Sequence, residues 1–237
     1  MPNNLQRIRD IVGKDPFVFS DTHFYHERCF SGFEPSRQQH AKTSTEFDDF
    51  MIGRFFSEGP VLFLGDLTIN ARKGEEETSM RVRLCSGRMT AMEKIIVLGN
   101  HDQAGLDTYE SCGWEVVSAG INLETGMIDE FSLPSLFFEK EEQRILASHY
   151  PIIPPNIQEE WKPFLRKENR AITDLFDSLG ATINLHGHTH SRCFDDERMM
   201  NVSIEAQDFR CRRLSDLLKT RPLDNRNRSG YNLLVNK

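Results

Sequence analysis

Ile95-Ile96-Val97-Leu98-Gly99-Asn100-His101-Asp102 is the stretch that decides the fold, because an unbroken apolar run ends directly in Gly, Asn, His and Asp. Four apolar residues without alternation are typical of a strand buried on both faces of a sheet. The same arrangement occurs at four further places, 17–23, 61–66, 145–149 and 183–190. Strands of an open α/β sheet end at a common crevice, where ligands bind. We therefore expect these segments to deliver polar side chains to one pocket.

Segments of helical period separate the apolar runs. Phe47, Met51 and Phe55 recur at the spacing of one helix face. Further elements are expected as helices over 75–92, 171–179 and 214–218 and as a closing strand over 202–204. This alternation of strands and helices indicates a layered α/β fold. We expect one domain over 1–219, followed by a polar tail over 220–237 that is rich in Asn and Arg.

Composition excludes several classes of protein. The chain has 237 residues, a polar start without a signal-peptide core, and no apolar run near the roughly 20 residues that span a membrane. Five cysteines, an odd number without a Cys-x-x-Cys pair, favour a reduced protein without a thiolate zinc site. The formal charge of −7 disfavours broad electrostatic binding of nucleic acid. These counts favour a cytoplasmic protein without membrane contact and specify no oligomeric state.

Spacing within the polar segments favours metal binding. Asp21 and His23 are two residues apart, as are His188 and His190. In extended backbone such residues project to the same side, so each pair can bind one metal ion or two adjacent ones. The glycine before His188 allows a tight turn and close approach of the backbone to a bound group.

Each motif taken alone also has an ordinary interpretation. Gly65-Asp66 is a common turn after a strand, and a single histidine such as His149 is more often structural than a ligand. Asn100 and His101 are neighbours and should point to different sides, one toward a metal ion and the other toward substrate. The functional interpretation therefore rests on the five segments together.

Together these residues resemble the calcineurin-like metallophosphoesterase family, whose ordered signature is Asp-x-His, Gly-Asp, Gly-Asn-His-Asp, a later His, and Gly-His-x-His. All five blocks occur between Asp21 and His190, although Ser148-His149 stands where the family often has Gly-His. The start Ser-Asp-Thr-His-Phe resembles a small bacterial and phage branch of predicted phosphoesterases. The resemblance implies a layered α/β sandwich of central mixed β-sheets flanked by helices, with a dinuclear metal site at the carboxyl ends of strands.

The resemblance also implies the ligands of two metal ions. One ion would be held by Asp21, His23, Asp66 and His190, and the other by Asp66, Asn100, His149 and His188. Asp66 is the expected bridge, because one carboxylate can bind two ions that lie about 3.5–4 Å apart. Imidazole, carboxylate and amide ligands suit two divalent or mixed-valence transition-metal ions rather than calcium. Manganese is our prediction, with iron, zinc and nickel as alternatives.

The expected activity is hydrolysis of a phosphoester by metal-activated water, with a small phosphodiester or a nucleotide as substrate. His101 is the candidate to protonate the leaving group or stabilise the transition state, and Asp102 the candidate to orient its ring. His26 and Arg28 are candidates for contacting the substrate phosphate, with an ordinary solvated loop as the equal alternative. His186 is interpreted as structural or as a support for the ligands.

Two other functions stay open. A metal-dependent nuclease would need the basic clusters at 72–73, 81–88, 166–170 and 210–213 to line one groove that leads to the metal ions, whereas their interspersed acidic residues favour a solvated surface. A catalytically silent protein-binding scaffold of the same fold would lack ligands, whereas every ligand position is filled here. The segments outside the motifs, 28–46, 103–144 and 151–168, are expected to select the substrate.

Overall fold

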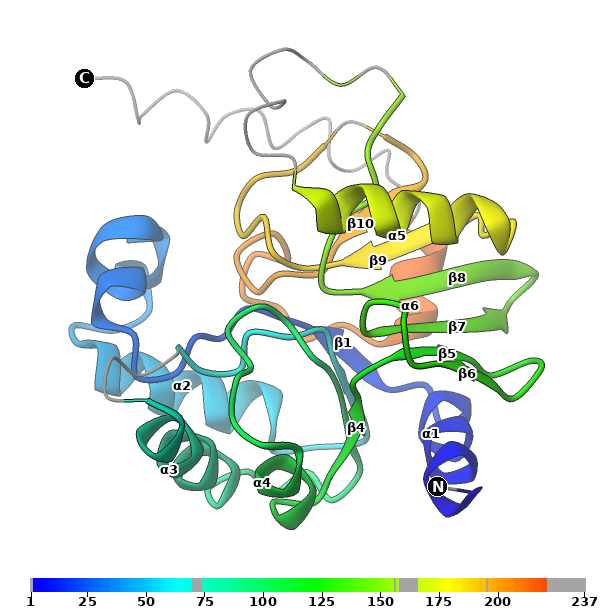
Figure 1. The fold of residues 1–237 in the computed structure, drawn as a ribbon. Helices are drawn as coiled ribbons and strands as arrows, with labels where there is room; N and C mark the ends of the chain where they lie inside the picture. Colours follow the sequence, from blue (N-terminus) through cyan, green and yellow to red (C-terminus); the bar gives the residue numbers. More distant parts are fainter. Residues whose placement is uncertain (1, 70–73, 156, 158–165, 195, 221–237) are drawn as a thin grey trace.

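Two β-sheets form the centre of the computed structural model, which describes residues 2–69, 74–155, 157, 166–194 and 196–220 (Figure 1). The first sheet is parallel throughout, in the order β1 (Phe17–Phe19), β2 (Val61–Phe63), β3 (Lys94–Val97) and β4 (Trp114–Val117). The second sheet is mixed, in the order β10 (Met199–Asn201), β9 (Ile183–His186), β8 (Gln143–Ser148), β7 (Ser135–Lys140), β5 (Gly120–Asn122) and β6 (Met127–Asp129).

The main core lies between the facing sides of these sheets. Val18, Leu62 and Ile95 from the first sheet share one buried cluster with Ile145 and Leu185 from the second. Each is completely buried, and such a side chain contributes about 1.5–3 kcal/mol to folding. Helices α1 (Pro2–Gly13) and α6 (Leu214–Lys219) add apolar side chains to the same cluster. The continuous apolar runs of the sequence are thus explained by burial on both faces.

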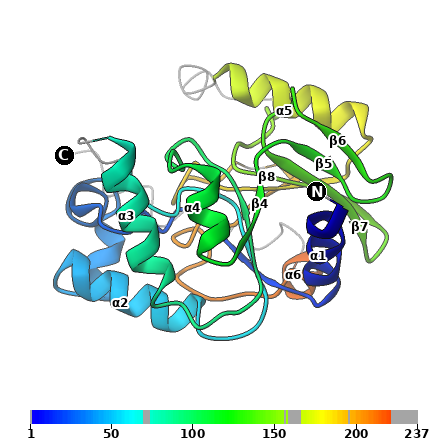
Figure 2. The same cartoon turned by 60° about the horizontal axis from the view of Figure 1, so that its bottom comes forward.

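Helices cover the outer face of each sheet. On the first sheet lie α2 (Ser44–Phe55), α3 (Glu75–Ser86) and α4 (Leu106–Ser111), and on the second lies α5 (Lys167–Ser178) (Figure 2). Helix α2 begins where the Thr43 side chain accepts a hydrogen bond from the Glu46 amide. Two short turns, η1 (Cys29–Phe33) and η2 (Pro35–Gln39), precede it. The predicted fold of mixed sheets flanked by helices is confirmed.

Several expected boundaries were wrong. Helix α3 ends at Ser86 rather than at position 92, because Gly87 caps it, and the last strand covers 199–201 instead of 202–204. Helix α1 was not predicted, although Leu5, Ile8 and Val12 lie on its buried side. Strands β4 to β7 were also not predicted; they lie within the segment 103–144, which was expected to help select the substrate.

The chain ends lie partly outside this description. Helix α6 ends at Lys219, and the polar tail from position 221 is outside the described residues, as are positions 156 and 158–165 of the segment 151–168 that was expected to help select the substrate. Within the described part of the chain, no helix is long and apolar enough to cross a membrane. All five cysteines are free thiols.

Candidate metal centre

The loops that follow strands of both sheets meet at one place. The amide of Asp21, after β1, donates to the carbonyl of Gly65 after β2 at 3.0 Å, and the amide of Gly187, after β9, donates to the carbonyl of His149 after β8, also at 3.0 Å. Ser20 forms a single parallel bridge with Ser203, which joins the end of β1 to the second sheet. Backbone hydrogen bonds thus bring residues from distant parts of the sequence to one site.

Two glycines allow these loops to approach each other closely. Gly65 has a φ of +87°, in the left-handed region that favours glycine. A Cβ atom there would lie 2.7 Å from the Gly99 amide nitrogen and 2.8 Å from Nδ1 of His149. A Cβ on Gly99 would in turn lie 2.8 Å from the Asp66 amide nitrogen. Any side chain at either position would push the loops after β2 and β3 apart.

Three ligand candidates form the first cluster. Oδ1 of Asp21 lies 3.9 Å from Nε2 of His23 and 3.8 Å from Nε2 of His190. His23 is 4% exposed, and neither of its ring nitrogens has a hydrogen-bond partner. Such orphaned polar atoms are rare in folded proteins and need an explanation. Ligands at roughly 2.1 Å from one ion lie about 3–3.5 Å apart, so a small contraction around a cation would satisfy them.

A second cluster surrounds the buried ring of His149. Its Nδ1 lies 2.9 Å from the carbonyl oxygen of Leu64, to which it donates as an N–H. The remaining lone pair on Nε2 then faces Oδ1 of Asn100 at 3.1 Å and Nδ1 of His188 at 3.2 Å. A backbone carbonyl that fixes the ring in this way is typical of metal-binding histidines.

Asp66 lies between the two clusters. Its Oδ2 is 3.5 Å from Nε2 of His23 and 3.4 Å from Nε2 of His149, while its Oδ1 accepts a hydrogen bond from the His101 amide at 2.9 Å. Burial, together with the negative charges of Asp21 and other carboxylates, raises the pKa of Asp66 to about 7. One oxygen atom is therefore at nearly the same distance from ligand candidates of both clusters.

These atoms fit divalent cations. Among the described residues, carboxylate and imidazole atoms within 4.8 Å of one another form two groups, Asp21 with His23 and His190, and Asp21 with Asp66 and His149. Asn100 and His188 join the second group through the contacts of His149. Acceptor atoms that converge at one buried point repel one another, and bound cations would remove that cost. All seven predicted ligand residues are thus brought together, and their binding of metal remains a prediction.

Asp102 occupies a different place from the one expected. Its Oδ2 accepts hydrogen bonds from the amides of Asp66 at 2.7 Å and Gly99 at 2.9 Å, and its Oδ1 accepts from the amide of Leu67 at 3.0 Å and the Tyr109 hydroxyl at 3.3 Å. Nδ1 of His101 is buried without a hydrogen-bond partner. The expected contact between the Asp102 carboxylate and the His101 ring is therefore absent, because backbone amides occupy that carboxylate.

The other candidate residues differ in their proximity to the clusters. The ring centroid of His23 lies 5.3 Å from that of His101 and 5.6 Å from that of half-buried His26. Arg28 is exposed at the start of η1, without a described contact to the clusters. Nδ1 of His186 lies 3.0 Å from the Gly187 carbonyl, and burial lowers the pKa of this ring to about 4, so the structural interpretation fits it.

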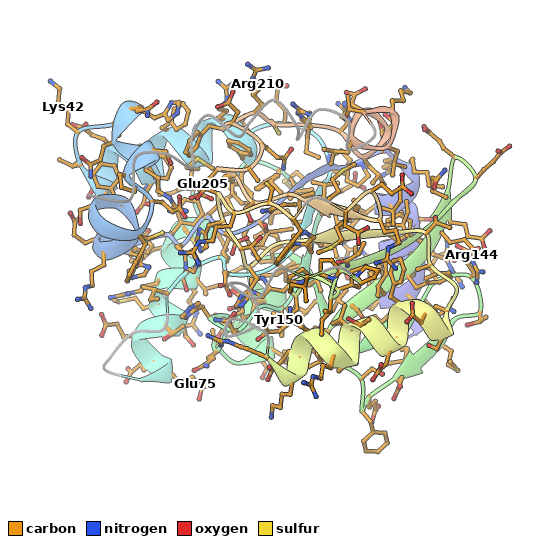
Figure 3. All side chains as sticks on the ribbon, turned by 90° about the horizontal axis from the view of Figure 1, so that it is seen from above. Lys42, Glu75, Arg144, Tyr150, Glu205 and Arg210 are labelled. Carbon is orange, nitrogen blue, oxygen red and sulfur yellow. The ribbon has the colours of Figure 1, made fainter. Side chains whose placement is uncertain are left out.

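Sequence reasoning missed several residues around the clusters. Buried Arg37 and Glu205 contact the ligand loops, and in Figure 3 Glu205 lies inside the outline of the molecule, whereas Lys42 lies at its edge. The hydroxyls of Ser20 and Ser203 donate to Oδ2 of Asp21 at 2.6 and 2.9 Å. Only the serine that adjoins the first motif carried a signal, because the others lie 16 or more positions from it in the chain.

Comparisons with known proteins agree with this arrangement. A family model described as calcineurin-like phosphoesterase matches residues 17–192. A solved protein of unknown function from Aquifex aeolicus is 19% identical, with a TM-score of 0.55, over 86% of this chain and 97% of its own. That likeness shows the fold.

Other solved structures match more weakly, and no curated protein matches significantly. Vacuolar protein sorting 29 from Cryptosporidium parvum is 15% identical over 79% of this chain and 71% of its own, with a TM-score of 0.33. A nuclease from Pseudomonas putida is 13% identical over 75% of this chain and 62% of its own, with a TM-score of 0.32.

Proposed function

The chain belongs to the calcineurin-like phosphoesterase family, and from this premise we propose that it is a hydrolase with two metal ions that cleaves a small phosphodiester. The observation that carries the proposal is the position of Asp66, whose Oδ2 lies 3.5 Å from a nitrogen of one cluster and 3.4 Å from a nitrogen of the other. A shared carboxylate between two ligand sets is the arrangement that two-metal hydrolysis requires.

The proposed ligand sets follow the two clusters. Asp21, His23, Asp66 and His190 would hold one ion, and Asp66, Asn100, His149 and His188 the other. When bound, two such ions neutralise charge on the phosphoryl oxygens and lower the pKa of a coordinated water. The donor set suits manganese, iron, zinc or nickel, and we propose manganese as the first to test.

His101 is the proposed donor to the substrate. Its backbone amide holds Asp66, whereas its side chain lies beside His23 without a hydrogen-bond partner on Nδ1. Burial is the largest cause that lowers the pKa of His101, so the ring is uncharged at neutral pH. An uncharged imidazole carries one N–H, which would donate to a phosphoryl or leaving-group oxygen.

Side chains at the edge of the site support a nucleotide as substrate. The half-buried ring of His26 lies 6.1 Å, centre to centre, from the ring of Phe33, which is 67% exposed. An exposed aromatic ring close to the metal ligands would offer a surface on which a base can stack. Burial is the main cause that lowers the pKa values of His101 and His188, and the positive charge of Arg166 lowers them further, so Arg166 would attract a phosphate near the second cluster. Arg28 has no comparable support.

A pair of substrates with one leaving group tests the nucleotide proposal. Thymidine 5′-(p-nitrophenyl) phosphate carries a base, whereas methyl p-nitrophenyl phosphate does not. Phe33→Ala should raise KM for the thymidine ester at least several-fold, in line with stacking worth about 1–3 kcal/mol, and should leave the methyl ester unchanged. Phe131, which is fully exposed in the loop between β6 and β7, provides the matched control as Phe131→Ala. Equal effects on both esters would exclude a base-stacking role for Phe33.

A hydrolysis panel tests the activity itself. Chelator-treated protein should regain hydrolysis of bis-(p-nitrophenyl) phosphate when Mn²⁺ is restored, and Asp66→Ala should not. The panel should also contain p-nitrophenyl phosphate, cyclic nucleotides and single-stranded DNA, which separate a monoesterase and a nuclease from the proposed activity. A protein that binds no metal and stays inactive with Mn²⁺, Ni²⁺ or Zn²⁺ would instead be a silent scaffold. We place this activity in a single domain over 1–219.

A further inference from the structure

Arg37 is one of the largest completely buried side chains among the described residues, and its side-chain hydrogen bonds lead to the candidate metal ligands. It stands in η2, is 1% exposed, and packs its guanidinium 5.1 Å from the centre of the Phe47 ring. Its Nη1 donates to the carbonyl of Thr22 at 2.8 Å, and its Nη2 donates to the carbonyl of Asp21 at 2.7 Å. A buried charge is costly unless it is fully paired, and Arg37 is paired by these two carbonyls and by Glu205.

The two carbonyls belong to the turn that carries the first ligands. Asp21 has a φ of +61° and His23 a φ of +48°, so both adopt left-handed backbone without being glycine. Such conformations are unfavourable and persist only where the surroundings enforce them. The guanidinium of Arg37 binds both carbonyl groups between these residues with two separate N–H groups, which fixes the peptide planes of the turn.

The third contact of Arg37 leads to Glu205. Oε1 of Glu205 accepts from Nε of Arg37 at 2.7 Å, whereas Oε2 is buried without a hydrogen-bond partner. That free oxygen lies 3.6 Å from Nδ1 of His190, which also lacks a partner. A donor and an acceptor, both orphaned, face each other just beyond hydrogen-bond distance. A hydrogen bond between them would keep the proton on Nδ1 and leave the lone pair of Nε2 free for a metal ion.

Glu34 supports the same ring from the neighbouring turn. Its carboxylate lies 3.9 Å from Nδ1 of His190 and accepts a hydrogen bond from the Ser191 hydroxyl at 3.3 Å. The second cluster has no equivalent among the described residues, because Nδ1 of His149 donates to the uncharged carbonyl of Leu64. Among the described residues, a side-chain carboxylate therefore faces the Nδ1 atom of a ligand histidine only in the first cluster.

We propose that Arg37 and Glu205 are positioning residues for the first metal ion, Arg37 by fixing the turn of Asp21 and His23 and Glu205 by orienting the ring of His190. This inference rests on the metal binding in the proposed function and concerns only one of the two ligand sets. Neither residue contacts substrate. Their loss should weaken one of the two metal-binding equilibria and leave the other in place.

The test measures metal binding without turnover. Chelator-treated protein is titrated with Mn²⁺ by calorimetry, and free Mn²⁺ is counted by electron paramagnetic resonance. Glu205→Gln, which keeps the shape and removes the charge, should weaken one binding constant 10–100-fold, as other losses of ligand support do, and change the other less than threefold. Glu115→Gln is the matched control, because Glu115 is also a mostly buried glutamate paired with an arginine, Arg7, at 2.9 Å.

Two further variants assign the affected constant. His190→Ala should weaken the same constant, and adding Glu205→Gln to it should cause little further loss, because both act through one ring. Arg37→Lys can pair with Glu205 but cannot reach both carbonyls in the same way, so it should weaken that constant with native circular dichroism.

Different results would overturn the proposed function and the positioning role of Arg37 and Glu205. A wild-type protein that binds no Mn²⁺ would overturn the proposed function and this inference with it. If wild-type protein binds two ions, either of two results would overturn the inference alone. In the first, Glu205→Gln is indistinguishable from Glu115→Gln; in the second, Glu205→Gln weakens both binding constants equally. Failure of the hydrolysis panel would leave these binding constants, and therefore the inference, unaffected.

Discussion

Replacing Asp102 by Asn distinguishes a structural role for this carboxylate from the catalytic role that the sequence indicates. Each carboxylate oxygen accepts two hydrogen bonds, Oδ2 from the amides of Asp66 and Gly99, and Oδ1 from the Leu67 amide and the Tyr109 hydroxyl. In Asp102→Asn one oxygen becomes an NH₂ group. Turned toward the amides of Asp66 and Gly99, it leaves two donors without an acceptor; turned the other way, it leaves only the Leu67 amide without one, because the Tyr109 hydroxyl can rotate to accept.

The expected cost follows from these contacts. Each buried donor left without an acceptor costs about 1–3 kcal/mol, so Asp102→Asn should lower the free energy of unfolding by about 1–3 kcal/mol, the cost of the less unfavourable orientation. The loss of a buried charge whose pKa burial has raised offsets part of this cost and favours the lower half of the range. Domains of ordinary stability have about 5–15 kcal/mol in total, so the variant should fold but unfold at clearly lower denaturant.

Urea denaturation of chelator-treated protein measures this loss, with Tyr109→Phe as control. That variant removes only the 3.3 Å hydrogen bond and should cost about 1 kcal/mol or less. Affinity for Mn²⁺ should also fall, because the amides held by Asp102 belong to Asp66 and to Gly99, which precedes Asn100. Asp102→Asn with wild-type stability and metal affinity but a large loss of kcat would refute this reasoning and restore the role of Asp102 in orienting His101.

Three further predictions follow from the same contacts. His101→Ala should lower kcat by about 10²–10⁴-fold with little change in Mn²⁺ affinity, and near-wild-type turnover would exclude it as proton donor. Burial raises the pKa of Asp48 from 3.8 to about 7, so its contribution to stability is complete below pH 3.8 and is lost as the pH rises to 7. In urea denaturation, the free energy of unfolding of Asp48→Asn should therefore rise relative to that of wild type by up to about 4 kcal/mol from pH 4 to pH 8. Asp49→Asn, at an exposed position, is the control. Parallel pH profiles of Asp48→Asn and wild type would contradict this prediction. Adding Mn²⁺ at 100 times its Kd to chelated protein should stabilise it by about 2.7 kcal/mol, whereas an unchanged melting temperature would argue against binding to the folded state.

The sequence was sufficient for the buried strands and the ligand candidates, because both carry local signals. Strands β2 and β3 are continuous apolar runs, and polar residues follow them directly. Strands β5 and β6 carry no such signal, since all three residues of β6 are exposed and β5 has a single apolar side chain, Ile121, between Gly120 and Asn122. Helix α1 was missed because its apolar residues are sparse among polar ones and acquire meaning only against the core that they cover.

Contacts between residues distant in the chain could not be predicted in the same way. Arg37 and Glu205 are 168 positions apart, and neither stands in a motif. Asp102 stands in a motif, but its neighbour in sequence, His101, is not the group that its carboxylate contacts. Local spacing identifies which residue types gather at a site, whereas the partners of a buried charge depend on the packing of the whole fold.

Backbone conformation explains why residues two apart in sequence can share a site. Extended backbone was expected at the paired ligands. Instead, five ligand candidates have left-handed φ values between 48° and 69°: Asp21, His23, Asp66, His188 and His190. Each such residue costs about 1–2 kcal/mol, so together they cost on the order of the stability of a whole domain. After β9, His188 consequently faces His149 in the second cluster, whereas His190 faces Asp21 in the first.

This strain must be balanced by interactions that hold the turns from outside. Arg37 binds the carbonyls of the first turn, Asp102 binds the amides of the second, and the Asp21 carboxylate accepts the amide of His188 in the third. Each of the three is a charged group bonded to backbone, which makes the bonds stronger than those between neutral groups. The ligand geometry is therefore maintained by buried charges behind the turns as well as by the strands before them, and variants of these charges should alter metal affinity before they alter the fold.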